Sequence, residues 1–205
     1  MSARDAIFAA IRAHRPPGQH DLPLVPIFPV AEPEGRIATF GRNLKSMGGQ
    51  LFEPDPGGDP LAPLRARLTT AEIVCSAAAE VSGNRNLAAV MKPQDLADID
   101  VAIVRAAFGI AETGSVLFTE QELQVNALAY LAQHLVVLLD PDDIVSSTQE
   151  AYHRPEFHHA HYASFHSGPS ATADIEGVLI HGAQGVRSLT VLLLPKEHGA
   201  TASVS

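Results

Sequence analysis

The sequence predicts an α/β fold in which a mainly parallel sheet is flanked by helices. Continuous apolar runs recur along the chain, as expected of strands that are buried on both faces. Segments with apolar residues at helical spacing lie between several of these runs, and strands that alternate with helices favour parallel pairing. With 205 residues, 46% of them hydrophobic, the chain can bury one full core, so we expect one main domain.

The composition excludes several classes of function. A net charge of −9 and scattered basic residues argue against nucleic acid, because its binding needs Lys and Arg against the phosphates. We expect no membrane span, since no segment approaches about 20 uninterrupted apolar residues. The amino terminus lacks the apolar core of a signal peptide, so we expect a cytoplasmic protein. The single cysteine, Cys75, can neither form an intrachain disulfide nor hold an iron–sulfur cluster, and we expect it in the core.

The amino-terminal segment is predicted to be a helix followed by an extended arm. Ser2 and Asp5 have the spacing of a capping box, and an apolar stripe runs from Ile7 to Ile11. Residues 16–35 contain six prolines and therefore form neither a helix nor a central strand. Because this stretch is too apolar for a free linker, we expect it to lie over the body or over a second subunit.

The middle of the chain alternates between predicted helices and strands. A helix is predicted over residues 37–47, and Gly48-Gly49 ends it, as glycine does after a last turn. The other elements predicted up to residue 139 are strands over 50–53, 72–76, 100–105, 115–119 and 135–139, with helices over 61–68 and near 84–91.

Three more elements are predicted towards the carboxyl end. Asp140 and Pro141 have the residue types of a helix cap and first turn, which predicts a helix that ends near residue 154. Ser170 or Thr172 can cap a further helix that begins at Ala173. The apolar run over 189–194 predicts a last buried strand.

The first candidate site is the segment 108–115, which joins two predicted strands. Glu112 has the chemistry of a general base or of a carboxylate that binds a hydroxyl group. Thr113, Gly114 and Ser115 can supply donors to an anion. The alternative is a polar turn whose glycines allow a positive φ.

The second candidate site is the loop that contains Gly168, Pro169, Ser170, Thr172 and Asp174, with Arg187 further along the chain. The acidic side chains at positions 174 and 176 argue against a bare phosphate cradle, because they would repel a second negative charge. A ligand here is expected to be rich in hydroxyls, a cation, or an anion that Arg187 also meets. The alternatives are a loop that only caps a helix and an arginine on the surface.

Five histidines gather over residues 153–166. A metal site at His158, His159 and His161 is an alternative function, because neutral imidazoles suit transition metals. Their spacing matches no metal motif, so we expect a solvated or interfacial turn and no bound metal. No dinucleotide, P-loop, nucleophile-elbow or Cys-x-x-Cys motif is present in the sequence.

Both candidate sites resemble segments of the LutC/YkgG family, lactate utilization proteins built on a LUD domain. Residues 109–115 (Gly-Ile-Ala-Glu-Thr-Gly-Ser) resemble its Ala-Glu-Thr-Gly-Thr turn. Residues 168–176 (Gly-Pro-Ser-Ala-Thr-Ala-Asp-Ile-Glu) resemble its Gly-Pro-Ser-x-Thr-Ala-Asp-Ile-Glu segment, and the likeness spans roughly residues 36–195. The resemblance implies a fold similar to the NagB/RpiA/CoA-transferase group and a role in oxidising L-lactate to pyruvate. It also implies two partner subunits with iron–sulfur clusters; with one cysteine, this chain would carry none.

Two positions depart from the family pattern. Gln184 stands where the family has a histidine, and Arg105 where it has a threonine, so the ligand can differ. The leading hypothesis is a non-iron–sulfur subunit that binds a small anionic ligand. The alternatives are a stand-alone NagB/RpiA-like enzyme with Glu112 as base or nucleophile on a sugar phosphate or acyl-CoA, and a metal-binding or regulatory protein. We expect an arm over 1–35, an α/β domain over 36–195, a flexible tail over 196–205, and a homo-oligomer as one form of assembly.

Overall fold

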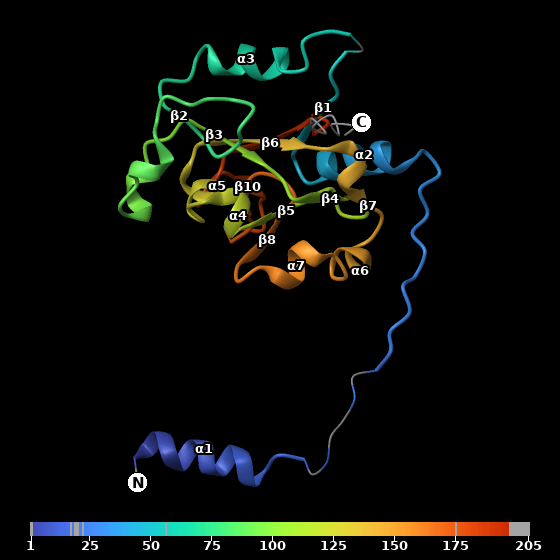
Figure 1. Cartoon of the computed structure of the whole chain (residues 1–205), viewed down its shortest axis with the longest axis vertical. Helices are drawn as coiled ribbons and strands as arrows, with labels where there is room; N and C mark the ends of the chain where they lie inside the picture. Colours follow the sequence, from blue (N-terminus) through green and yellow to red (C-terminus); the bar gives the residue numbers. More distant parts are fainter. Residues whose placement is uncertain are drawn as a thin grey trace, which may run out of the picture.

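A computed structural model describes residues 2–16, 18, 21, 23–55, 57–174 and 176–196. Its body contains a central sheet, a smaller second sheet and short helices, and the first helix lies away from this body at the end of an extended arm (Figure 1). No helix among these residues is long and apolar enough to cross a membrane.

The central sheet has five strands, all parallel. Their order is β1 (Gln50–Phe52), β11 (Ser188–Leu193), β6 (His134–Leu139), β3 (Val101–Arg105) and β2 (Val74–Ser76). In register, Ser188 lies opposite His134, and His134 lies opposite Val101. The predicted fold class, a mainly parallel sheet flanked by helices, is thus confirmed.

Both faces of this sheet are covered. On one face Ile103, Val136 and Leu192 pack against Leu64 of helix α3 (Ala62–Leu68). On the other face, alternate residues such as Val137 pack against helix α2 (Arg36–Ser46) and the second sheet. Figure 1 accordingly shows α3 on one side of the central sheet and the second sheet on the opposite side. Burial on both faces explains why the strands are continuous apolar runs and not alternating ones.

The second sheet has the order β7 (Ile144–Val145), β4 (Phe108–Ile110), β5 (Ser115–Thr119) and β8 (Ala163–His166). Strand β5 is fully buried, as its apolar run predicts, but it pairs antiparallel with β4 and β8. A two-stranded antiparallel hairpin follows, made of β9 (Ala171–Thr172) and β10 (Ile180–His181).

Short helices connect these strands. They are α2 (Arg36–Ser46), α4 (Glu120–Leu123), α5 (Leu128–Leu131), α6 (Thr148–Ala151) and α7 (Pro155–His159), with 3-10 turns at η1 (Leu87–Ala89), η2 (Pro93–Leu96) and η3 (Pro141–Asp143). Helix α2 ends where the glycine pair predicts, and Gly48 has a φ of +85°.

Three predicted helices are wrong. Asp140 does cap a turn, but only a 3-10 turn, because Ile144 and Val145 pair with β4 and interrupt any longer helix. The helix near 84–91 is reduced to η1, which the Asn86 side chain caps. No helix begins at Ala173: the Thr172 hydroxyl bonds the Asp174 carboxylate, and the described chain turns into the β9–β10 hairpin.

The amino-terminal helix α1 (Ala3–Ala13) has the capping box that its sequence predicts, and none of its residues is buried. The described residues between α1 and α2 form no helix or strand. Gln149 of α6 holds this arm through the backbone N–H of Phe28, at 2.9 Å, and the carbonyl of Pro26, at 3.3 Å. The division into arm, α/β domain and tail stays a prediction, and residues 197–205 of the expected tail lie outside the described residues.

Candidate functional site

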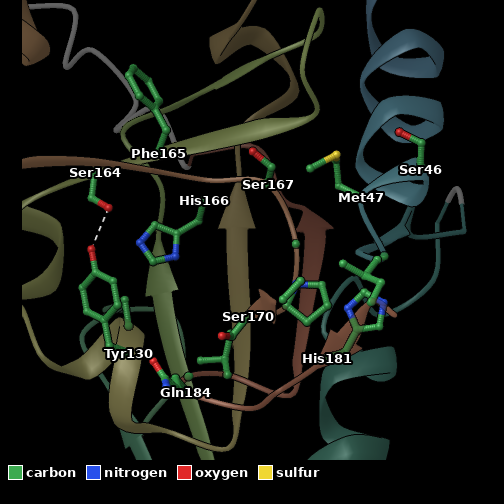
Figure 2. Close-up of a pocket in the computed structure, with 18 of the residues that line it drawn as sticks. Ser46, Met47, Tyr130, Ser164, Phe165, His166, Ser167, Ser170, His181 and Gln184 are labelled. Carbon is green, nitrogen blue, oxygen red and sulfur yellow. Dashed lines mark hydrogen bonds between the residues drawn. The ribbon is translucent and has the colours of Figure 1, made fainter. Parts of the chain in front are cut away.

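The Gly-Pro-Ser loop forms one wall of a cavity of about 570 Å³. The cavity lies near the amino ends of β1 and β11, between the last turn of α2, strand β8 and the loop before β11 (Figure 2). The lining residues with polar side chains are Lys45, Ser46, Tyr130, Ser164, His166, Ser167, Ser170, His181 and Gln184. A hydroxyl-rich wall of this kind can hydrogen-bond a small polar ligand.

His166 is the most perturbed titratable group of the cavity. Burial lowers the pKa of His166 to about 4, so the imidazole is neutral at physiological pH. Its Nε2 is buried and has no hydrogen-bond partner among the described residues. The rings of Phe118 and Tyr130 lie 5.1 Å from its ring, centroid to centroid, and hold it in place. A buried nitrogen without a partner is costly, and a ligand that bonds it would remove that cost.

Hydroxyl groups gather beside this histidine. Strand alternation puts Ser164 on the same face of β8 as His166, and the Tyr130 hydroxyl lies 2.7 Å from the Ser164 Oγ (Figure 2). The same hydroxyl bonds that of Tyr162, whose pKa is raised by burial and by this bond. Figure 2 shows Met47 and His181 on the opposite side of the cavity.

A chain of hydroxyls joins the two candidate segments. The Thr113 Oγ1 lies 2.7 Å from the Ser115 Oγ, which lies 2.6 Å from the Ser167 Oγ at the start of the Gly-Pro-Ser loop. Both segments also contact α2 through glycine: a Cβ on Gly114 would lie 2.1 Å from the Leu44 nitrogen, and one on Gly168 2.2 Å from the Met47 carbonyl oxygen. The segment 109–115 therefore holds the Gly-Pro-Ser loop in place through the Ser115–Ser167 hydrogen bond, without lining the cavity itself.

Glu112 has a structural contact that accounts for its charge. Its Oε2 accepts the backbone N–H of Thr148, at 2.8 Å, and the Thr148 hydroxyl, at 3.0 Å. The Glu112 carboxylate thus lies at the amino end of α6, where a negative charge complements the positive end of the helix. Glu112 is not among the residues that line the cavity.

The structure brings together only part of the predicted ligand-binding set. Gly168, Pro169 and Ser170 line the cavity, whereas Glu112, Thr113, Gly114, Ser115, Thr172, Asp174 and Arg187 do not. Sequence reasoning missed Tyr130, Ser164 and His181, which no motif distinguishes. It placed His166 in a histidine cluster but could not see that this residue alone of the five faces the cavity. Gln184, noted as a departure from the family, is a lining residue.

The other chemical candidates have less support. In the described part of the chain, no group of three or more His, Cys, Asp or Glu is placed to hold a metal ion. The candidate set His158, His159 and His161 is therefore not arranged as a metal site. Cys75 is buried in β2, and burial raises the pKa of its thiol, against a smaller lowering by Arg85. It therefore stays protonated at neutral pH, as suits a core residue.

Comparisons with known proteins agree with the two motifs. The family model of the LUD domain matches residues 82–194, which contain both segments. A crystal structure of a DUF162 family protein from Deinococcus radiodurans has a TM-score of 0.57 and 19% identity, over 80% of this chain and 99% of that chain. At this identity the likeness establishes the fold alone. No curated protein matches. Because the family model covers more than half of the sequence, the chain belongs to the LUD domain family.

Proposed function

We propose that this LUD-family chain is a subunit without iron–sulfur clusters that assists the oxidation of L-lactate to pyruvate. In this proposal it binds a small anion with a hydroxyl or keto group, of the 2-hydroxy-acid class, in the cavity of the Gly-Pro-Ser loop. The single observation that carries the proposal is the unpartnered Nε2 of His166 in a hydroxyl-lined cavity.

The chemistry of the two walls supports a ligand of this class. The neutral imidazole of His166 and the hydroxyls of Tyr130 and Ser164 suit a hydroxyl or carbonyl oxygen. Lys45 and His181, which also line the cavity, supply cationic or titratable groups for a carboxylate. Lys45 lies in the last turn of α2, where a cation offsets the negative end of the helix dipole.

Electron transfer is assigned to partner subunits. The oxidation releases two electrons, whereas the only cysteine of this chain is buried and protonated. We therefore expect the iron–sulfur clusters on partner proteins. The extended arm is the expected docking segment, because Leu24 is 99% exposed and Val25, Ile27 and Phe28 are exposed beside it.

Ligand binding to the purified chain tests the cavity. We expect L-lactate or pyruvate to raise Tm, by roughly 5–10 °C at 100 times Kd for a chain of this size. His166→Gln should abolish this shift, while the matched control His153→Gln, at an exposed position outside the cavity, should keep it. No shift with either acid, or an equal loss in both variants, would refute the ligand.

Co-purification tests the subunit role separately. We expect the tagged full chain to retain iron–sulfur proteins, detected by iron content and visible absorbance of the eluate. A variant with Leu24 and Phe28 changed to serine should lose them and keep the ligand-induced shift. A homodimer that turns over sugar phosphates or acyl-CoA without partners would support the stand-alone enzyme and refute this role.

A further inference from the structure

Two arginines of the body are not neutralised. Of the eight arginines between residues 23 and 196, six form ion pairs with carboxylates. Arg67 and Arg187 form none with the described residues, although the chain has 23 acidic residues against 14 basic ones. In so acidic a protein, two unpaired arginines call for an explanation in terms of what they meet.

Arg67 lies beside His134 at the amino ends of β6 and β11, and Arg187 comes directly before β11 at the same edge of the sheet. Arg67 reaches from α3, and its Nη1 and Nη2 donate to Thr190 Oγ1, at 2.6 Å, and Ser188 Oγ, at 3.0 Å. Arg187 directly precedes Ser188, which lies opposite His134 in the sheet. Burial, then Arg67 and then Arg187 lower the pKa of His134, so the two cations are close enough to act on it.

The hydrogen bonds determine which donors are left over. The Ser188 Oγ accepts from Arg67 and also forms a hydrogen bond with the Nδ1 of His134, 2.8 Å away. The lowered pKa of His134 favours its neutral imidazole at neutral pH. Arg67 uses two of its five N–H groups for the hydroxyls, which leaves the others available.

These donors border a cavity of about 490 Å³ on this edge of the sheet, lined by Arg67, Thr70, Ala71, Glu72, Asp100, Val101 and His134. Asp100 also faces His134 and raises its pKa, but its carboxylate accepts the backbone N–H groups of Glu72 and Ile73. The exposed Glu72 lies at the same cavity. At His134 the lowering of the pKa by the two arginines outweighs the raising by Asp100, so the charges that act on this imidazole are net positive.

We propose that Arg67 and His134, with Arg187 at the same edge of the sheet, form a second ligand site, which binds the carboxylate or phosphate group of a small molecule. Guanidinium groups match such oxyanions in geometry and charge. The site is distinct from the cavity of the Gly-Pro-Ser loop and goes beyond the proposed function. Gln184 and Val186, which come shortly before Arg187 in the chain, line the first cavity.

NMR titration of His134 with inorganic phosphate and with acetate tests this site. We expect saturable binding of one or both that raises the pKa of His134, because a bound anion favours the imidazolium. Arg187→Gln should weaken binding roughly ten- to a hundredfold, the loss of one charge-assisted hydrogen bond. Because the Arg187 side chain is exposed, we expect Arg187→Gln to fold even if Arg67→Gln does not. The matched control is Arg65→Gln. Arg65 lies on α3, as Arg67 does, but it pairs with Asp59 and so should not contribute to the site.

The outcomes separate this site from the first one. Binding that survives His166→Gln and is lost in Arg187→Gln supports the second site, whatever the fate of the lactate proposal. Absence of saturable binding of either anion to the native chain, or equal weakening by Arg65→Gln, would overturn it. If phosphate instead dissociates a dimer in size-exclusion chromatography, the occupant is a carboxylate of a second copy, and the small-molecule assignment is wrong.

Discussion

The variant Gly114→Ala tests whether the segment 109–115 packs closely against helix α2. The φ of Gly114 is +65°, and a Cβ at this position would lie 2.1 Å from the Leu44 nitrogen and 2.5 Å from the Leu44 Cα. These are backbone atoms of α2, which cannot move aside as a flexible side chain can. For Gly114→Ala we expect about 1–2 kcal/mol from the left-handed backbone and about 1–3 kcal/mol from overpacking.

Gly57→Ala is the matched control. Gly57 has a φ of +79°, but a Cβ there would meet nothing within 4 Å, so only the backbone cost of about 1–2 kcal/mol applies. Thermal and urea unfolding followed by circular dichroism should show Gly114→Ala less stable than the control by about 1–3 kcal/mol. At 2–4 °C per kcal/mol this is a Tm roughly 2–12 °C lower. Equal losses in the two variants would refute the close approach to α2.

Three more predictions follow from single contacts. For His166 the folded pKa of about 4 lies below the unfolded value near 6.5, so the unfolded state binds more protons and stability falls as pH decreases between these values, by about 3 kcal/mol at pH 4. Unfolding of His166→Gln should lack this part of the pH dependence, and identical pH profiles would contradict the burial of the ring. Glu112→Gln should lower the free energy of unfolding by about 1 kcal/mol, because one hydrogen bond to Thr148 weakens. It should leave ligand binding intact, and a loss of binding would show that Glu112 belongs to the ligand site. Removal of residues 1–25 should leave the Tm of the body within about 2 °C, since α1 buries nothing; a larger drop in calorimetry would show contacts that the described arm lacks.

Much of the fold could be predicted from local sequence. The run over 135–139 is a strand because five buried apolar residues in a row suit a sheet covered on both faces. Helix α2 ends at Ser46, shortly before Gly48, whose positive φ needs glycine. The predicted helix after Asp140 failed because pairing of Ile144 and Val145 with β4, a partner far away in sequence, overrode the local cap.

The candidate site likewise divides into features that the sequence predicts and features that depend on contacts between distant segments. The sequence by itself determined the family and singled out the Gly-Pro-Ser loop, because these depend on residue identity and order. Only the tertiary structure decided that His166 faces the cavity, that Glu112 bonds the first residue of α6, and that the charges of Arg67 and Arg187 act on His134. The physical reason is that a side chain acquires its function from its neighbours in space, and these come from strands and helices that the sequence keeps far apart.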